Sequence, residues 1–192
     1  MGSQAYFSNA GAFLINAVFG LYIFAVLLRL LFQLVRADFY NPLCQAIVAV
    51  TNPPLKRLRR VIPAFGRMDS SSVLLLIALQ TINTFLLASL VGASVALPGL
   101  VVVAMAELIS KTLWVFLGAI FIRVIASWVA PGAYNPILSV VDALCAPLMK
   151  PARRLIPPLG PLDLSPMVVI IGLQLAQIVL VAPIRDIGLA LL

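Results

Sequence analysis

Two halves of this sequence repeat each other at a fixed spacing. When residues 20–80 are moved forward by 94 positions they align with residues 114–174 without a gap, and 19 of the 61 positions are identical. Apolar matches arise by chance in a hydrophobic protein, but these matches include polar residues, prolines and glycines. They pair Arg29 with Arg123, Asn41 with Asn135, Pro42 with Pro136, Pro63 with Pro157, Gly66 with Gly160, Asp69 with Asp163, and Gln80 with Gln174. We therefore expect two similar units, with function at duplicated sites or at the boundary between the copies.

Long apolar runs show what surrounds these units. Hydrophobic residues make up 63% of the chain and charged residues only 10%, whereas soluble domains average about 25% charged. The runs cover residues 11–35, 73–97, 100–129 and 167–182, and the last one can continue through a proline kink toward the C-terminus. A helix needs about 20 residues to cross the hydrocarbon core of a bilayer. We predict an all-α membrane protein with four transmembrane helices, in which repeat 1 covers residues 1–97 and repeat 2 covers residues 98–192.

The basic residues gather in two segments of the chain. The net charge is +7, and nine of the thirteen Lys and Arg residues lie between the first and second runs or between the third and fourth. In a four-helix arrangement both segments face the same side of the membrane. The positive-inside rule places that side in the cytoplasm and both termini outside. Anionic lipid headgroups are the expected partner, and nucleic acid is not.

Each of these segments, 40–67 and 134–161, opens with Asn-Pro and continues as an amphipathic helix. Asn can cap the exposed N–H groups of a helix, and Pro fits its first turn. We expect this first short helix to end at Pro53 in repeat 1 and at Pro147 in repeat 2. A second short helix then completes a hairpin that lies on the membrane surface. Re-entrant loops that dip into the bilayer are the alternative.

The second short helix of each hairpin, at 55–62 and 149–156, interleaves basic and apolar residues. Such a helix lies in the membrane interface with its cations toward lipid phosphates. Each hairpin leads to an aspartate, Asp69 or Asp163, which can cap the next helix; a functional role would require it to meet the nearby arginines. The residues that we expect to bind lipid or a partner are Lys56, Arg57, Arg59, Arg60, Lys150, Arg153 and Arg154.

Catalytic chemistry has little support in this sequence. The chain contains no histidine, and its two cysteines, Cys44 and Cys145, do not have the spacing of a zinc site. It lacks a Gly-rich phosphate loop and a Gly-x-Ser-x-Gly motif, and its six acidic residues are scattered near the predicted membrane boundaries. We therefore expect neither an enzyme nor a resident cofactor or metal.

Four polar residues inside the predicted spans are further candidates. Arg29 and Arg123 are costly in lipid, which by default suggests function. Each lies near the end of its helix, so its long side chain can instead extend toward lipid phosphates as an anchor. Gln80 and Gln174 could hydrogen-bond across the axis that relates the repeats. A pore would have to run along the seam of the four helices or through a homo-oligomer.

The run from Lys150 to Pro166, KPARRLIPPLGPLDLSP, resembles the hallmark of the bacterial YggT (YlmG-related) family. The preceding Asn135-Pro136 fits as well, and repeat 1 carries the pattern again, with Arg67 and Ser72 where repeat 2 has prolines. The resemblance implies a small integral protein of the bacterial inner (cytoplasmic) membrane. Members of the family are associated with tolerance of osmotic shock and with potassium handling, but the resemblance implies no defined biochemical activity.

Two hypotheses follow from these observations. The preferred one is a non-enzymatic organiser or assembly factor, whose basic hairpins bind anionic lipid while the four-helix body offers a platform to an unknown membrane or cytoplasmic protein. Duplicated basic segments without a duplicated catalytic set favour it. The rival is a potassium channel or transport component, which the two intramembrane arginines and the osmotic association favour. Potassium flux into proteoliposomes separates the two.

Overall fold

The part of the chain that the structure describes is mostly helical, with short turns between the helices. The structure is a computed structural model that describes residues 2–60, 62, 69–129, 132, 135–155 and 163–192. Pro63, Gly66, Pro157 and Gly160 of the repeat motif lie outside the described residues. The elements are α1 (Gly2–Leu34), α2 (Pro42–Leu58), α3 (Ser70–Leu90), α4 (Leu97–Val129), α5 (Pro136–Leu155), α6 (Ser165–Ala176), a π-helical turn η1 (Gln177–Val181) and α7 (Ala182–Ala190).

Four of the helical segments are long and apolar enough to cross a membrane, as predicted. They are Tyr6–Leu34, Ser70–Leu90, Leu97–Val129 and Ser165–Ala190. The last one combines α6, η1 and α7, so the fourth helix does continue past Pro183. Large apolar side chains such as Phe13, Leu21 and Ile171 are exposed on these helices. In a bilayer those side chains contact lipid.

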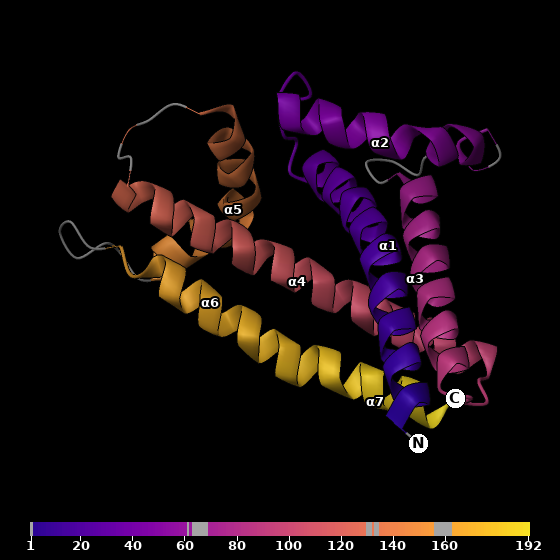
Figure 1. The fold of residues 1–192 in the computed structure, drawn as a ribbon. Helices are drawn as coiled ribbons and strands as arrows, with labels where there is room; N and C mark the ends of the chain where they lie inside the picture. The colour runs from indigo at the N-terminus through magenta and orange to yellow at the C-terminus, as the bar shows by residue number, and fades with distance from the viewer. Residues whose placement is uncertain (1, 61, 63–68, 130–131, 133–134, 156–162) are drawn as a thin grey trace.

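The helices are arranged so that both amphipathic elements lie at one end of the molecule. α1 packs against α3, α3 against α4, and α4 against α6 and α7. Figure 1 shows α2 across one end of α1 and α3 and α5 crossing α4 toward the same end of the molecule, while both termini and the connection between α3 and α4 lie at the other end. The two basic segments are therefore on the same side of the molecule. This agrees with the four-helix arrangement expected from the charge distribution.

The predicted break within each amphipathic segment was wrong. α2 is one helix with Pro53 and Pro54 inside it, and α5 is one helix with Pro147 and Pro151 inside it. Each repeat therefore presents one continuous amphipathic helix here, in place of a hairpin of two short helices. A proline inside a helix leaves the carbonyl four residues earlier without its N–H partner. For Pro53 that carbonyl belongs to Ala49, an exposed residue, so solvent or headgroups can satisfy it and the helix can continue.

The apolar core lies toward the end of the molecule that carries α2 and α5. Its most buried members include Ile23 and Val26 of α1, Ile120 of α4 and Val140 of α5. The core thus joins side chains of both repeats in one cluster. Because burial of apolar area is the main driving force for packing, this cluster fixes the positions of the two amphipathic helices relative to the spans.

Candidate functional site

The two Asn-Pro motifs begin α2 and α5 as predicted. The side-chain Oδ1 of Asn41 accepts a hydrogen bond from the backbone N–H of Leu43 at 3.0 Å, and Oδ1 of Asn135 accepts from that of Ile137 at 2.9 Å. Asn41 also donates from Nδ2 to the carbonyl of Pro136. The cap of one repeat therefore bonds directly to the equivalent motif of the other, which places the boundary between the copies at these two helix starts.

The basic residues predicted to bind lipid or a partner are exposed on the outer surface of α2 and α5 and at their C-terminal ends. Figure 1 shows both helices toward the same end of the molecule, with their starts close together and their basic C-terminal ends pointing away from each other. The residues concerned are Lys56, Arg57, Arg59, Arg60, Lys150, Arg153 and Arg154.

Each basic helix ends in an ion pair with the aspartate that precedes the next span. Arg59 binds Asp69, with its Nε donating to Oδ2 at 3.2 Å, and Arg153 binds Asp163, with 2.9 Å between Nη2 and Oδ2. The arginines and aspartates are repeat equivalents, so the structure builds the same link twice. Both aspartates thus contact the nearby arginines, which was the condition for a functional role. These contacts connect α2 to α3 and α5 to α6.

These ion pairs outweigh the effect of burial on the two carboxyl groups. Burial alone would raise the pKa of Asp69, but hydrogen bonds from Arg59 and Ser72 and the Arg59 charge bring that pKa below its usual value. Burial likewise opposes a lowered pKa at Asp163, where hydrogen bonds from Ser165 and Arg153 prevail. Both aspartates are therefore ionised at neutral pH and hold their arginines in place.

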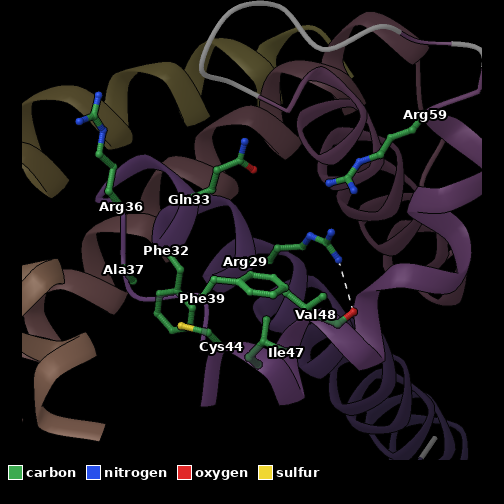
Figure 2. A pocket seen from close by; sticks show the side chains of 10 residues that line it. All are labelled: Arg29, Phe32, Gln33, Arg36, Ala37, Phe39, Cys44, Ile47, Val48 and Arg59. Atoms are coloured by element: carbon green, nitrogen blue, oxygen red, sulfur yellow. Dashed lines mark hydrogen bonds between the residues drawn. The ribbon is translucent and has the colours of Figure 1, made fainter. Parts of the chain in front are cut away.

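The side chain of Arg29 extends from α1 to α2 and is buried within the protein. Its residue is 8% exposed, and its Nη1 lies 2.8 Å from Thr51 Oγ1, 3.0 Å from Asn52 Oδ1 and 3.4 Å from the carbonyl of Val48. Figure 2 shows this side chain and its bond to Val48. The intramembrane arginine of repeat 1 thereby anchors an amphipathic helix to a span through neutral acceptors.

Arg123 anchors the amphipathic helix of repeat 2 with different chemistry. Its Nε lies 2.5 Å from Oδ1 of Asp142 on α5, and both side chains are about half exposed. Asp142 is the repeat equivalent of Val48, since the two positions differ by the same 94 residues. Equivalent positions of α2 and α5 therefore receive the two arginines, but a carboxylate is present in only one repeat.

Sequence reasoning missed these anchoring contacts, although it identified both arginines. Asp142 interrupts an apolar stretch of α5 between Val141 and Leu144. A carboxylate in such a stretch is a sequence signal that it pairs with a cation on a neighbouring span. Repeat 1 offers no such signal, because Thr51 and Asn52 are ordinary residues for the polar side of a surface helix. Only the packing of α1 against α2 shows that they face Arg29.

A cavity of about 370 Å³ lies beside Arg29, between the end of α1 and α2. Arg36 and Arg59 also line it, together with Phe32, Phe39 and Cys44. Figure 2 shows the guanidinium groups of Arg29 and Arg59 directed into the same space, whereas that of Arg36 is directed away from them. This cavity concentrates positive charge at the end of the molecule that carries the basic helices.

The predicted hydrogen bond between Gln80 and Gln174 is not formed. Gln80 is 2% exposed on α3, whereas Gln174 is exposed on α6, and these two helices do not contact each other. Helix α3 instead makes a polar contact with α1, where Nδ2 of Asn83 donates to Oδ1 of Asn16 at 3.4 Å. The two glutamines therefore lie in different environments despite their equivalent sequence positions.

The cysteines are buried free thiols. Burial and the nearby charge of Asp142 raise the pKa of Cys145 to about 11, against a smaller opposing effect of Arg123, and burial also raises the pKa of Cys44. Within the described part of the chain no group of three or more His, Cys, Asp or Glu side chains could hold a metal ion.

Comparison with known proteins places this architecture in a family. The family model of the CCB3/YggT proteins matches the chain twice, over residues 8–90 and over residues 102–184. The chain belongs to the CCB3/YggT family. The resemblance carried by the proline- and arginine-rich motif is thus confirmed, and so is a multi-pass membrane protein built from two tandem YggT segments with four spans.

Several proteins are similar to this family member over most of their length. A protein of Pseudomonas aeruginosa is 43% identical over 176 residues, which cover 91% of this chain and 89% of that protein. One of Vibrio alginolyticus is 41% identical over 172 residues, which cover 88% and 92%. YggT of Escherichia coli is 37% identical over 163 residues, which cover 85% of each chain. All three are described as uncharacterized, and no solved structure matches this chain.

Each of the two YggT segments contains one complete anchoring contact. Arg29 and its acceptors on α2 lie within residues 8–90, and Arg123 and Asp142 lie within residues 102–184. The family segment therefore corresponds to a structural unit of two spans with one amphipathic helix secured between them.

Proposed function

We propose that this YggT-family protein is a non-enzymatic organiser of the bacterial inner membrane that binds anionic lipid through α2 and α5. The basic region of these two helices lies at headgroup level on the cytoplasmic face, and both termini lie outside. The four spans and the basic surface form a platform for a membrane or cytoplasmic partner protein that acts in osmotic stress tolerance.

The observation that carries this proposal is the placement of α2 and α5 toward the same end of the spans (Figure 1), together with the exposure of their basic residues. Their apolar sides are buried, as Leu55 in α2 and Val140 and Leu144 in α5 show. A helix with one side in an apolar layer and cations on the other side suits the membrane interface. Each Lys or Arg near an anionic surface contributes about 1 kcal/mol of attraction.

The anchoring contacts support a rigid lipid-binding surface. α2 is held at its centre by Arg29 and near its end by the pair of Arg59 with Asp69. α5 is held by Arg123 and by Arg153 in the same two places. Basic residues on such fixed helices keep a constant spacing, which favours specific recognition over the loose attraction of a disordered basic tail.

The test is lipid selectivity in reconstituted bilayers. Electron paramagnetic resonance of spin-labelled lipid measures how strongly the protein prefers phosphatidylglycerol over phosphatidylcholine. Arg57, Arg60, Lys150 and Arg154 have no ion-pair partner among the described residues, so changing all four to Glu reverses most of the basic charge of α2 and α5 and leaves the anchoring contacts intact. We expect the preference of the wild-type protein to disappear in this variant and to weaken in high salt.

The control variant changes Arg185 to Glu, which alters a charge at the opposite end of the molecule. We expect it to keep the wild-type preference for phosphatidylglycerol. A quadruple variant that retained the full preference would refute the proposed lipid-binding surface.

Potassium transport is the second candidate, and one observation favours it. Gln80 Oε1, Thr81 Oγ1 and Asn83 Oδ1 are buried on α3 without a hydrogen-bond partner among the described residues. Neutral oxygens of this kind suit a monovalent cation. The arginines, in contrast, are both bonded to the amphipathic helices at the end of the spans, which favours an anchoring role for them. Potassium flux into the same proteoliposomes, at wild-type level in the quadruple variant, would favour transport over the organiser.

A further inference from the structure

The arginine-lined cavity between α1 and α2 has the composition of an anion site. Its lining includes Arg29, Arg36 and Arg59 and no carboxylate. Its volume of about 370 Å³ falls within the range of about 300–1,000 Å³ that is common for ligand sites. Figure 2 shows that Arg29 and Arg59 approach the same space from different elements, α1 and the end of α2.

Arg29 retains unused donors on the side of its guanidinium away from α2. Its three acceptors all contact Nη1. Nε and Nη2, which carry three N–H groups, have no partner among the described residues. These two nitrogens form the edge that binds the oxygens of a phosphate or carboxylate as a fork. An arginine that is only 8% exposed as a whole residue and has this edge without a partner among the described residues is suited to a ligand.

Arg29 also has no direct ion-pair partner among the described residues. Among the described residues no carboxylate forms an ion pair with it; Asp69 is near enough to attract it, but the Asp69 carboxylate is bound to Arg59. Asp38 lies close enough to Cys44 to influence it, but it accepts from the backbone N–H of Tyr40 and does not line the cavity. Arg29 and Arg59 are near enough to repel each other. Arg59 gives Nε and Nη2 to Asp69, so among the described residues its Nη1 remains free to meet an anion that Arg29 binds through Nε and Nη2.

Repeat 2 differs from repeat 1 in the partner of its intramembrane arginine. There the equivalent arginine, Arg123, has a carboxylate partner in Asp142, at the position where repeat 1 has Val48. A duplicated scaffold thus supplies the counter-charge internally in one copy and omits it in the other. A ligand can provide the missing negative charge in repeat 1.

We propose that this cavity binds a phosphate group between Arg29 and Arg59. The same chemistry is offered by a phospholipid headgroup and by a free phosphate ion. A second cavity of about 490 Å³ favours the lipid, because apart from Lys111 it is lined by apolar residues of α1, α2, α4 and α5, and it shares Phe32 with the arginine-lined one. The inference goes beyond the proposed function and rests on it only in placing this end of the molecule at headgroup level.

The experiment uses the full chain purified in detergent with two probes. Native mass spectrometry measures retention of dioleoylphosphatidylglycerol, and isothermal titration measures binding of sodium phosphate. Arg29→Gln removes the guanidinium. Val48→Asp keeps Arg29 and introduces the carboxylate that repeat 2 has at Asp142, so it tests the site even if Arg29→Gln does not fold. Arg185→Gln is the control, since it removes one positive charge at the far end of the molecule.

We expect saturable binding of one phosphate-bearing ligand per chain, weakened about tenfold or more in Arg29→Gln and in Val48→Asp, as the loss of a charge-assisted contact predicts. Arg185→Gln should bind like the wild type. Binding of the lipid alone identifies a headgroup, and binding of sodium phosphate identifies a site that also accepts the free ion.

Absence of saturable binding with both probes would overturn the proposal, as would a folded Val48→Asp variant that binds like the wild type. The quadruple variant of the basic surface separates this site from the proposed function. It should lose general selectivity for anionic lipid while it retains the single tightly bound phosphate, because none of its four altered residues lines the cavity.

Discussion

Helix α7 packs tightly against α4 at Gly188, and this contact can be tested by a single substitution. A Cβ atom added at Gly188 would lie 2.7 Å from Val103 Cγ2, 2.8 Å from the backbone nitrogen of Val103 and 3.1 Å from Val102 Cγ1. The backbone contact cannot be relieved by a side-chain rotation. Gly188→Ala therefore forces α7 away from α4, and overpacking of this kind costs about 1–3 kcal/mol.

A matched control exists in the same span. Gly172 in α6 would place its Cβ with no neighbouring atom within 4 Å, so Gly172→Ala meets no obstacle and gains up to about 1 kcal/mol of helix propensity. The same gain applies to Gly188→Ala and cancels in the comparison. We therefore expect Gly188→Ala to have a free energy of unfolding about 1–3 kcal/mol lower than that of Gly172→Ala.

The assay is unfolding by SDS in mixed micelles, followed by the fluorescence of Trp114 and Trp128 on α4. A second variant, Gly99→Ala, should behave like Gly188→Ala, because its added Cβ would lie 2.7 Å from the backbone of Leu191 and Leu192. Equal stability of Gly188→Ala and Gly172→Ala would refute the close approach of α4 and α7.

Two further predictions concern titratable groups. Asp69 has a lowered pKa when folded, so its ion pair stabilises the protein above the unfolded pKa of about 3.9 and is lost as the pH falls through the lower folded value. Asp69→Asn should lower the free energy of unfolding by about 1.5–3 kcal/mol at pH 7. Asp163→Asn should lower it by less than about 1 kcal/mol, because the wild-type side chain is 32% exposed. Unfolding measured between pH 3 and 7 checks this, and equal losses of stability in the two variants would contradict it. Cys145, with its pKa of about 11, should react with maleimide at pH 7.5 about 100-fold more slowly in the folded protein than in SDS, and equal rates would show an accessible thiol.

Much of the architecture follows from patterns that depend on chemistry alone. Apolar length predicted the four spans, and the 94-residue repeat predicted two equivalent units. The Asn-Pro pairs predicted both helix starts, because a side-chain cap needs only the residues next to it.

The errors arose where distant contacts override local preference. Pro53 and Pro147 predicted helix ends, yet both are exposed on helices whose other side is buried against the core, so packing maintains the helix through the proline. Gln80 and Gln174 predicted a symmetric bond, but α3 and α6 do not touch.

The candidate anion site was beyond reach from the sequence for a related reason. Arg29 was evident as an intramembrane cation, but its buried setting depends on Thr51 and Asn52 of α2, which lie 22 and 23 residues away along the chain. The difference between the repeats, Val48 against Asp142, was visible in the alignment. The sequence alone does not show that both positions lie beside an arginine, and only that contact makes the difference in charge significant.

The bond from Asn41 to Pro136 has a consequence for how the protein is made. The two residues are 95 positions apart, so the first repeat leaves the ribosome and enters the membrane before its acceptor in the second repeat exists. Until then the amide of Asn41 must be satisfied by water or lipid, and α2 begins without its neighbour. A separately expressed first repeat would keep its local helix cap but lack this bond, whereas the intact chain joins the two helix starts only after the second repeat has been made.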